Sequence, residues 1–501
     1  MKITEHSFAQ CTTNTRFICD LSISRFLTDA DVCEVLERLT IDDAHALQRS
    51  LRKALHEYST GTQGEAACAM HQPERTAMMA PSGKTTLFMP STSSSGIGMK
   101  VVTLATPGAK GPTAATADMT PHGALTIMSS NGTPTGFLNA EEVTAFRTAL
   151  CSSLLFCRRK SFKSITVFGA GRQAFWHIRL ALLLRGSSLK TVNIISRTFS
   201  DRVRDLLKTF YAIDLAIKER EGWENVKFSI LTPSYGEYAR LLKEQLRAAD
   251  VIITTVPSTT PLFDPSILTS TEGRRRGRLI IAIGSYKPHM IEIPIEVVQQ
   301  AVKPHEHRHF HKHAAEGGVV VVDTLTGCLK EAGEIIQSGL SPNQLVEVGE
   351  LVMLEGQLAE PDNSDDHEVD ADGKQIDLDG LRRELSDISS TGEGSMHAVM
   401  RQGSDLSTVS TESAGRKSID SASSSKGSRK SLGPGGIGNK IRSLSMDNKK
   451  VKSKDDAMAT WLGEGNVVYK CVGMGLMDLV VGGGLITLAR EKGVGTTIPN
   501  F

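Results

Sequence analysis

The spacing of apolar residues in the first 150 positions predicts helices followed by strands. Thr28 and Asp31 carry a helix-start signal, and apolar residues follow at three-to-four spacing. A second helix is predicted around Ala44 to Leu55. Short β-like runs then alternate with Gly, Pro, Ser and Asn between residues 85 and 136. We therefore expect two helices and a group of strands joined by turns.

Residues 161 to 322 show a different pattern, in which apolar strands alternate with helices. The strand-like runs are "SITVFG", "TVNIIS", "FSILT", "DVIITTV", "RLIIAIG" and "VVVVD". Near-continuous apolar strands separated by helices are typical of a parallel sheet with helices on both faces. The sequence thus predicts an α/β fold with a nucleotide-binding domain in this region.

A glycine motif follows the first of these strands. In "VFGAGRQA", Gly169 would permit the tight turn, Gly171 would let a pyrophosphate approach the backbone, and Ala174 would allow close packing of helix on strand. Arg172 and Gln173 open the helix and are expected to contact the cofactor. A Gly-x-Gly-x-x-Ala motif is weak evidence alone, but its position between strand and helix favours a dinucleotide site.

The end of the second strand bears on which cofactor binds. NAD-binding domains carry an acidic residue there that bonds the ribose hydroxyls, about 20 residues past the glycines. This chain has Ser196, Arg197 and Thr198 instead, which offer a cation and two hydroxyl groups. We therefore expect NADP(H) to be favoured over NAD(H), with these three residues at the 2′-phosphate.

The C-terminal third contains two unusual segments. Residues 361–456 are rich in Ser, Asp, Lys and Gly and poor in apolar residues, which predicts a disordered insertion. The segment Cys471–Ala489 is apolar enough to suggest a membrane span. It contains Asp478 and five glycines, however, so a buried helix and turn in a soluble core are favoured.

Composition narrows the partners and the compartment. The chain has 57 basic and 56 acidic residues, and this balance argues against a nucleic-acid partner. Its eight cysteines are scattered without Cys-x-x-Cys pairs, which fits reduced thiols rather than a disulfide framework or a metal site. The N-terminus lacks a secretory signal pattern. We expect a cytoplasmic protein that does not bind membranes.

Eight ordered blocks resemble the ornithine cyclodeaminase/mu-crystallin family over residues 28–356 and 458–501. They are "PERTAMMAP", "GMKVVT", "VTAFRTAL", "FGAGRQA", "ADVIITTVPSTTPLF", "IGSYKPHMIE", "VVDTLTGCLKEAGE" and "VVYKCVGMGLMD". The resemblance implies a Rossmann domain inserted in a second α/β domain that binds substrate and forms a homodimer. The expected division is 1–150 for the first part of the substrate domain, 151–335 for the Rossmann domain, 336–360 and 457–501 for the return to the substrate domain, and 361–456 for the insertion.

The resemblance also assigns roles to residues. Arg75 and Lys100 match the positions that hold a substrate carboxylate, and Lys100 is also expected to transfer a proton. Arg147 is expected to face either the cofactor phosphates or the substrate. The other residues carried over are Tyr286 for substrate binding, and Thr255, Val256 and Cys471 for cofactor binding.

One position departs from the cyclodeaminases of this family. They carry an aspartate where Tyr286 stands, and a tyrosine with a pKa near ~10 cannot act as a carboxylate base at neutral pH. We therefore expect an NAD(P)H-dependent oxidoreductase that moves a hydride to or from the α-carbon of a small amino or imino acid. Two alternatives stay open. One is an ornithine cyclodeaminase that makes proline and ammonia, and the other is a non-catalytic binder like mu-crystallin.

Overall fold

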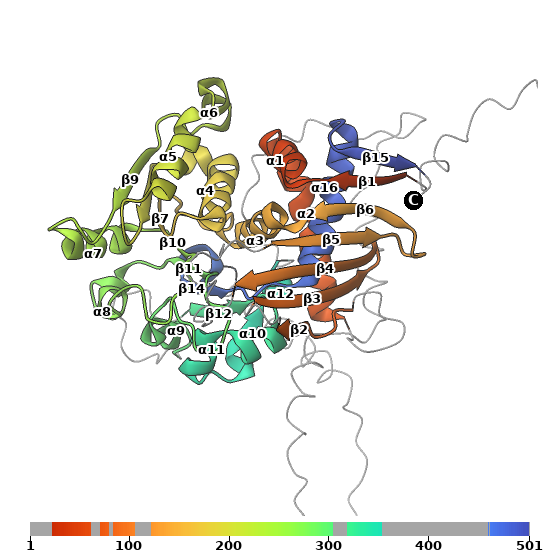
Figure 1. Cartoon of the computed structure of the whole chain (residues 1–501). Helices are drawn as coiled ribbons and strands as arrows, with labels where there is room; N and C mark the ends of the chain where they lie inside the picture. The colour runs from red at the N-terminus through yellow and green to blue at the C-terminus, as the bar shows by residue number, and fades with distance from the viewer. Residues whose placement is uncertain are drawn as a thin grey trace, which may run out of the picture. The chain divides into compact units, whose positions relative to one another are not determined.

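The computed structural model describes residues 23–61, 71–79, 84–105, 122–303, 318–352, 459 and 461–499. The predicted insertion at 361–456 lies outside these residues. The described residues form two sheets, one of seven strands and one of eight (Figure 1).

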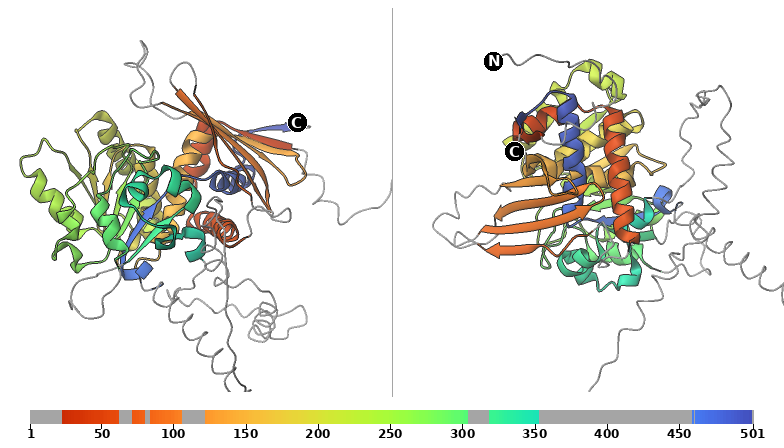
Figure 2. Two further views of the ribbon diagram at one scale, coloured as in Figure 1. Left: turned by 90° about the horizontal axis from the view of Figure 1, so that it is seen from below. Right: turned by 90° about the vertical axis from the view of Figure 1, so that its right-hand side faces the viewer.

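The seven-stranded sheet has the order β15-β1-β6-β5-β4-β3-β2, and only its β1–β6 pair is parallel. Helices α2, α3 and α16 lie along one face of it (Figure 2). The strands are β1 (Ile23–Leu27), β2 (Thr76–Met79), β3 (Lys84–Ser93), β4 (Gly96–Ala105), β5 (His122–Met128), β6 (Pro134–Asn139) and β15 (Thr496–Pro499). The helices of this domain are α1 (Asp29–Glu37), α2 (Ile41–Thr60), α3 (Ala140–Phe156) and α16 (Gly475–Glu491).

The two predicted N-terminal helices are confirmed, and their ends follow from capping. Thr28 caps α1, and it forms a reciprocal capping box with Asp31. Thr40 and Asp43 form the same arrangement at the start of α2. Each box satisfies backbone N–H groups that a helix start otherwise leaves unpaired. The apolar stripes of both helices are buried.

The apolar C-terminal segment forms the buried helix α16, as the sequence predicts. It packs against α2 and α3 and against strands β3, β4 and β5. Gly482 allows this approach, since a Cβ there would lie 2.6 Å from a methyl carbon of Leu125. In the described part of the chain, no helix has both the length and the apolar character required to cross a bilayer.

All neighbouring strands of the eight-stranded sheet are parallel, in the order β13-β12-β14-β11-β10-β7-β8-β9. The strands are β7 (Ser164–Phe168), β8 (Thr191–Ile195), β9 (Lys227–Leu231), β10 (Val251–Thr254), β11 (Leu279–Ala282), β12 (Gly318–Val322), β13 (Leu345–Glu347) and β14 (Asn466–Lys470). The predicted parallel sheet is thus confirmed.

Helices cover both faces of this sheet, because alternate residues of each strand point to opposite sides. In β10, Val251 and Ile253 belong to the core shared with α4 and α5, whereas Ile252 belongs to the core on the other face. The helices of the first face are α4 (Arg172–Arg185), α5 (Asp201–Ala212) and α6 (Leu215–Glu221). Those of the second face are α7 (Tyr238–Ala248), α8 (Ser266–Thr269), α9 (Ile295–Ala301), α10 (Leu325–Glu331) and α11 (Gly333–Ser338).

The chain order reverses at β7, which has β8 on one side and β10 on the other. Parallel sheets bind ligands outside the carboxyl ends of their strands at such a point. The carboxyl end of β7 is the position of the glycine motif. The topology therefore places the motif where a dinucleotide would bind.

The structure corrects the expected domain boundaries. The expected division places residues 336–360 and 457–501 in the substrate domain. Strands β13 and β14 from these ranges instead pair within the eight-stranded sheet of the Rossmann domain. Strand β14 lies between β11 and β12, because its run "NVVYK" is buried on both faces like its neighbours. The short helix α12 (Val348–Leu351) then packs on α2. At the other end, α3 runs through the boundary set at residue 150.

Candidate active site

The glycine turn has the geometry that the motif predicts. Gly169 has φ +110°, which disfavours other residues, and a Cβ there would lie 2.5 Å from Thr255 Oγ1. Gly171 caps α4, and a Cβ added to it would meet nothing within 4 Å. Ala174 is fully buried beneath the turn. The backbone before α4 is therefore tightly held on one side and open on the other, as the approach of a phosphate requires.

The two residues that open α4 lie in different surroundings. The Arg172 guanidinium is engaged by carboxylates of the substrate domain, namely Asp29 at 3.3 Å and Glu141 and Glu142 at 3.1 Å. Gln173 Oε1 is shielded from solvent and has no hydrogen-bond partner among the described residues. The role of both in cofactor binding stays a prediction.

The three residues predicted to select the cofactor follow β8 at the same sheet edge. Ser196 is half-buried, and Arg197 and Thr198 are exposed. No acidic side chain occupies these three positions.

Thr255 and Val256 follow β10 and face the glycine turn. Thr255 Oγ1 donates to the backbone carbonyl of Phe168 at 2.8 Å, which ties the end of β10 to the end of β7. The Val256 N–H donates to Glu292 Oε1 at 2.7 Å. Both predicted cofactor residues thus lie against the glycine turn.

Cys471 follows β14, and its thiol is buried. Its Sγ donates to Asp323 Oδ2 at 3.1 Å. The same carboxylate oxygen accepts the backbone N–H groups of Val472 at 3.1 Å and Gly473 at 2.6 Å. Burial raises the pKa of Cys471 well above its ordinary value. Asp323 thereby fixes the loop after β14, and the thiol of Cys471 is engaged by this carboxylate; its role in cofactor binding stays a prediction.

Lys100, from β4, is buried against α3 and α16. Its Nζ donates to Thr144 Oγ1 at 2.7 Å and to Asp478 Oδ1 at 2.9 Å, and both Lys100 and Asp478 are at most 2% exposed. Burial lowers the pKa of Lys100 to about 8, with Asp478 raising it and Arg147 lowering it. A buried amine with a pKa near neutrality can give or take a proton at physiological pH.

Arg147 shares the same carboxylate. Its Nε lies 3.3 Å from Asp478 Oδ1, and its Nη1 donates to Met477 Sδ at 3.4 Å. Burial lowers the pKa of Arg147, but Asp478, Cys471, Asp323 and Cys151 together raise it above its ordinary value. A Cβ on Gly473 would approach Arg147 Nη2 to 2.9 Å. Glycine therefore leaves room for the guanidinium beneath the loop that Asp323 fixes.

Arg75 lies beside this group but is engaged by a carboxylate of the chain itself. Its Nε donates to Glu331 Oε1 at 2.7 Å, and Nη2 contacts the second oxygen of the same carboxylate. Arg75 and Glu331 line a cavity of about 110 Å³ with Met89, Thr324, Gly473 and Gly475. Glu331 thus occupies Nε and Nη2 of Arg75, and a substrate carboxylate at these two nitrogens would compete with it.

Tyr286 is half-buried near Arg75, and burial raises its pKa. It follows Ser285, whose hydroxyl donates to Glu334. Lys470 Nζ donates to the Ser285 carbonyl at 2.5 Å, and Glu292 accepts the Gly284 N–H at 2.6 Å. This buried network fixes the loop that carries Tyr286.

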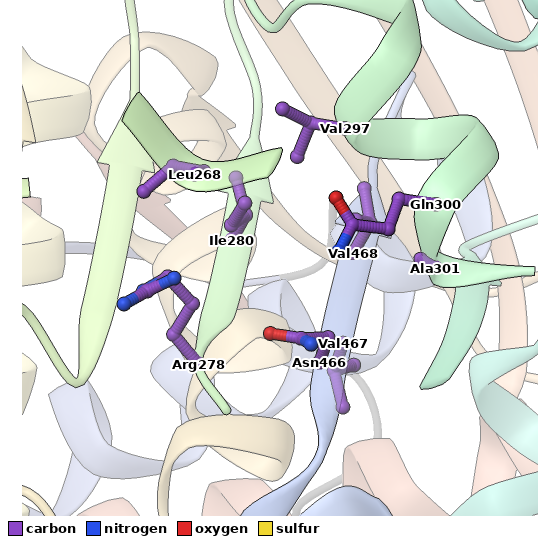
Figure 3. A pocket seen from close by; sticks show the side chains of 9 residues that line it. All are labelled: Leu268, Arg278, Ile280, Val297, Gln300, Ala301, Asn466, Val467 and Val468. Atoms are coloured by element: carbon purple, nitrogen blue, oxygen red, sulfur yellow. The ribbon is translucent and has the colours of Figure 1, made fainter. Parts of the chain in front are cut away.

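A second cavity, of about 20 Å³, lies at the opposite edge of the sheet (Figure 3). Arg278 precedes β11 there, Asn466 begins β14, and Gln300 comes from α9. The volume suits about one water molecule. Because it lies at the amino ends of the strands, it is not a candidate for cofactor or substrate.

The structure therefore brings together Arg75, Lys100, Arg147 and Tyr286, and separately groups the glycine turn with Ser196–Thr198, Thr255 and Val256. Sequence reasoning missed Thr144, Asp478 and Glu331 as members of the site. The signal for Asp478 was present, since a charged residue in an apolar helix is seldom buried without a partner.

No protein-family model matches the chain. An uncharacterized protein of Saccharomyces cerevisiae is 30% identical over 243 residues, covering 44% of this chain and 60% of that protein. Δ(1)-Pyrroline-2-carboxylate reductase of Bacillus cereus is 26% identical over 269 residues, covering 52% and 68%. An uncharacterized cyclodeaminase of Dictyostelium discoideum is 30% identical over 165 residues, covering 31% and 42%. The matches to the first and third relatives thus span less than two thirds of those proteins.

Solved structures resemble the chain over nearly its whole length. Thermococcus litoralis Δ(1)-pyrroline-2-carboxylate reductase in complex with NADH and L-proline gives a TM-score of 0.55 at 15% identity, covering 95% of this chain and all of that one. An archaeal alanine dehydrogenase dimer with bound NAD also gives 0.55 at 15% identity, covering 96% of this chain and all of that one. At this identity the likeness shows the fold.

The chain is thus similar to reductases and cyclodeaminases of the ornithine cyclodeaminase/mu-crystallin family. The predicted resemblance and the α/β fold with a Rossmann domain are thereby confirmed. This similarity leaves several reactions open, because solved structures of this fold include a reductase, a dehydrogenase and a cyclodeaminase.

Proposed function

We propose that this chain is an NADP(H)-dependent oxidoreductase that moves a hydride between the nicotinamide and the α-carbon of a small imino or amino acid. The observation that carries the proposal is the buried Lys100, with a pKa of about 8, beside Arg147 and Arg75. Such a group suits a substrate that has a carboxylate and a nitrogen that changes protonation. The names of the relatives, among them a pyrroline-2-carboxylate reductase, support this substrate class.

The residues at the carboxyl ends of β7 and β8 fit a nicotinamide dinucleotide. Gly171 leaves the space that a pyrophosphate needs, and α4 presents its N-terminus to it. Two structural relatives hold NADH or NAD. The preference for NADP(H) is our own inference from Ser196, Arg197 and Thr198, which offer donors to a 2′-phosphate and no repelling carboxylate.

When bound, the cofactor supplies or accepts the hydride. The chain supplies the remaining requirements for C=N reduction, in which a hydride adds to carbon and a proton to nitrogen. Arg75 binds the substrate carboxylate in competition with Glu331, and Arg147 raises the local positive charge. Lys100, in its ammonium form, gives the proton to nitrogen.

Cyclodeamination is less well supported, because Tyr286 stands where cyclodeaminases carry an aspartate. Burial raises the pKa of Tyr286 further, so its hydroxyl stays protonated at neutral pH. The Tyr286 hydroxyl can donate a hydrogen bond to a bound substrate, but it does not replace a carboxylate base.

We also propose that the chain forms a homodimer, as the family resemblance implies. The archaeal alanine dehydrogenase of the same fold is a dimer. Helices α2, α3 and α16 cover one face of the seven-stranded sheet, and no described helix covers the other (Figure 2). Light scattering of the purified full chain should give twice the mass of 54.1 kDa.

The test of the proposed function is NADPH oxidation in the presence of cyclic ketimines such as Δ1-pyrroline-2-carboxylate. We expect turnover at neutral pH, and we expect Lys100→Ala to abolish it. Ornithine, incubated with the same protein and a catalytic amount of NAD(P), should give no proline. Tight binding of NADPH and ketimine without turnover would overturn the proposal in favour of a binding protein.

A further inference from the structure

We propose that Thr144 and Asp478 are positioning residues that fix two N–H groups of Lys100. The third position on the Lys100 Nζ is then the one that exchanges a proton with the substrate nitrogen. The inference rests on the proposed function and adds two residues to it. Neither touches substrate in this scheme, because both act through Lys100.

The hydroxyl of Thr144 can only accept a hydrogen bond from Lys100. Its hydroxyl proton is already given to the backbone carbonyl of Ala140, one turn earlier in α3. A hydroxyl has one proton and two lone pairs, so the contact of 2.7 Å with Lys100 Nζ must be donated by the lysine. One N–H of Lys100 is therefore directed at Thr144.

Asp478 fixes the second N–H. The carboxylate is fully buried in α16, and its Oδ1 lies 2.9 Å from Lys100 Nζ. Its Oδ2 is shielded from solvent and has no hydrogen-bond partner among the described residues. A carboxylate that is only partly hydrogen-bonded keeps a strong field at its neighbour, which favours the charged form of Lys100.

These two contacts exist in both protonation states of Lys100. An ammonium has three N–H donors, whereas a neutral amine has two and one lone pair. With two N–H groups held by Thr144 and Asp478, the change between the states takes place at the third position. Among the described residues, that position has no hydrogen-bond partner. It alternates between a proton and a lone pair, which is what transfer to and from a substrate nitrogen requires.

Two neighbouring residues complete the charges that face Lys100. Arg147, from α3, shares Asp478 Oδ1 and lowers the pKa of Lys100, and Arg75 lowers it too. Removing the charge of Asp478 leaves these two cations as the main charges at Lys100. The ammonium form is then disfavoured, so the pKa of Lys100 should fall.

The experiment measures kcat/KM for ketimine reduction against pH in the full chain with saturating NADPH. Reduction needs the ammonium form, so activity should be present below a pKa of about 8 and fall as pH rises through it. Asp478→Asn should move this falling part of the pH profile, the alkaline limb, to lower pH by about 1–3 units. Asp478→Glu, which restores the charge, should move it back toward its original position.

Thr144→Val should act differently, because it removes an acceptor without changing charge. We expect kcat to fall about ten- to hundredfold through loss of orientation, with the limb in place. Thr144→Ser should recover most of the activity. Thr148→Val is the matched control, since Thr148 lies one turn later in α3 and donates to the Thr144 carbonyl rather than to Lys100. It should stay within about twofold of the natural protein.

An unmoved limb in Asp478→Asn, or equal losses in Thr144→Val and Thr148→Val, would overturn the proposal. If the protein reduces no ketimine, the proposed function fails, and a binding titration decides the positioning claim separately. In that titration, NADPH-loaded protein is mixed with pyrrole-2-carboxylate, a planar carboxylate that cannot be reduced. The Kd of pyrrole-2-carboxylate should increase as the pH rises through the pKa of Lys100. In Asp478→Asn, this increase should occur at a lower pH. The same pH dependence in both proteins would overturn the claim.

Discussion

Gly169→Ala should chiefly lower stability, whereas Gly171→Ala should chiefly lower cofactor affinity. Gly169 has φ +110°, and its added Cβ would lie 2.5 Å from Thr255 Oγ1 and 3.3 Å from Val256 Cγ2. A residue held in a disfavoured backbone conformation costs roughly 1–3 kcal/mol, and the clash with Thr255 adds to this. Gly171 is extended, and its Cβ would meet nothing within 4 Å, so the change should cost about half a kcal/mol as a lost N-cap preference.

The assay is urea unfolding without cofactor, followed by NADPH titration of each folded variant. Gly169→Ala should lose stability. Gly171→Ala should keep its stability but bind NADPH at least tenfold more weakly, on the order of 1.4 kcal/mol, because its methyl group occupies the space of the pyrophosphate. Natural NADPH affinity in Gly171→Ala, or natural stability in Gly169→Ala, would refute the reasoning about this turn.

Three further predictions concern cofactor choice, substrate binding and the insertion. Arg197→Ala should narrow the preference for NADPH over NADH by roughly ten- to hundredfold in affinity, and equal affinities in the natural protein would contradict the assignment. Arg75→Ala should chiefly raise KM, and Arg75→Lys should restore little of the loss. Glu331→Gln should lower KM, because it removes the competing carboxylate. Steady-state kinetics that show no change in any of the three variants would return Arg75 to a structural role. A short Gly/Ser linker in place of residues 361–456 should preserve cofactor affinity and turnover. Arg158 contacts the Val352 carbonyl at 2.7 Å, and the Lys160 N–H contacts the Gly463 carbonyl at 3.1 Å, so the described residues on either side of the segment lie close together. An aggregated product would show that the segment is required for folding.

The parts of the fold that the sequence predicts are those in which local pattern and burial agree. The strand at Ser164–Phe168, the glycine turn and α4 follow one another with the expected periodicities, and each is found in place. The capping pair Thr28 and Asp31 fixes the start of α1 in the same local way. Such signals depend only on residues a few positions apart.

Pairing between distant segments could not be read in this way. Strand β14 inserts between β11 and β12 from a segment more than 100 residues further along the chain, and its apolar run has no feature that names its neighbours. The roles of Glu331 and Asp478 likewise depend on contacts with residues far away in the sequence. Glu331 contacts Arg75 across 256 positions, and Asp478 contacts Lys100 across 378. Arg172 illustrates the converse case, since its place beside the glycines suggests a cofactor contact, yet carboxylates of the other domain engage it.

The measurement that tests the central claim most directly is the transfer of deuterium from NADPH labelled at C4 of the nicotinamide. Full-length protein is incubated with a cyclic ketimine carboxylate and each of the two C4-deuterated forms of NADPH in turn, and the product is analysed by mass spectrometry and NMR. We expect a cyclic amino acid with one deuterium at its α-carbon from one form and none from the other, in equal amount to the NADPH consumed. Product without deuterium from either form, or no product from a protein that binds both ligands, would contradict it.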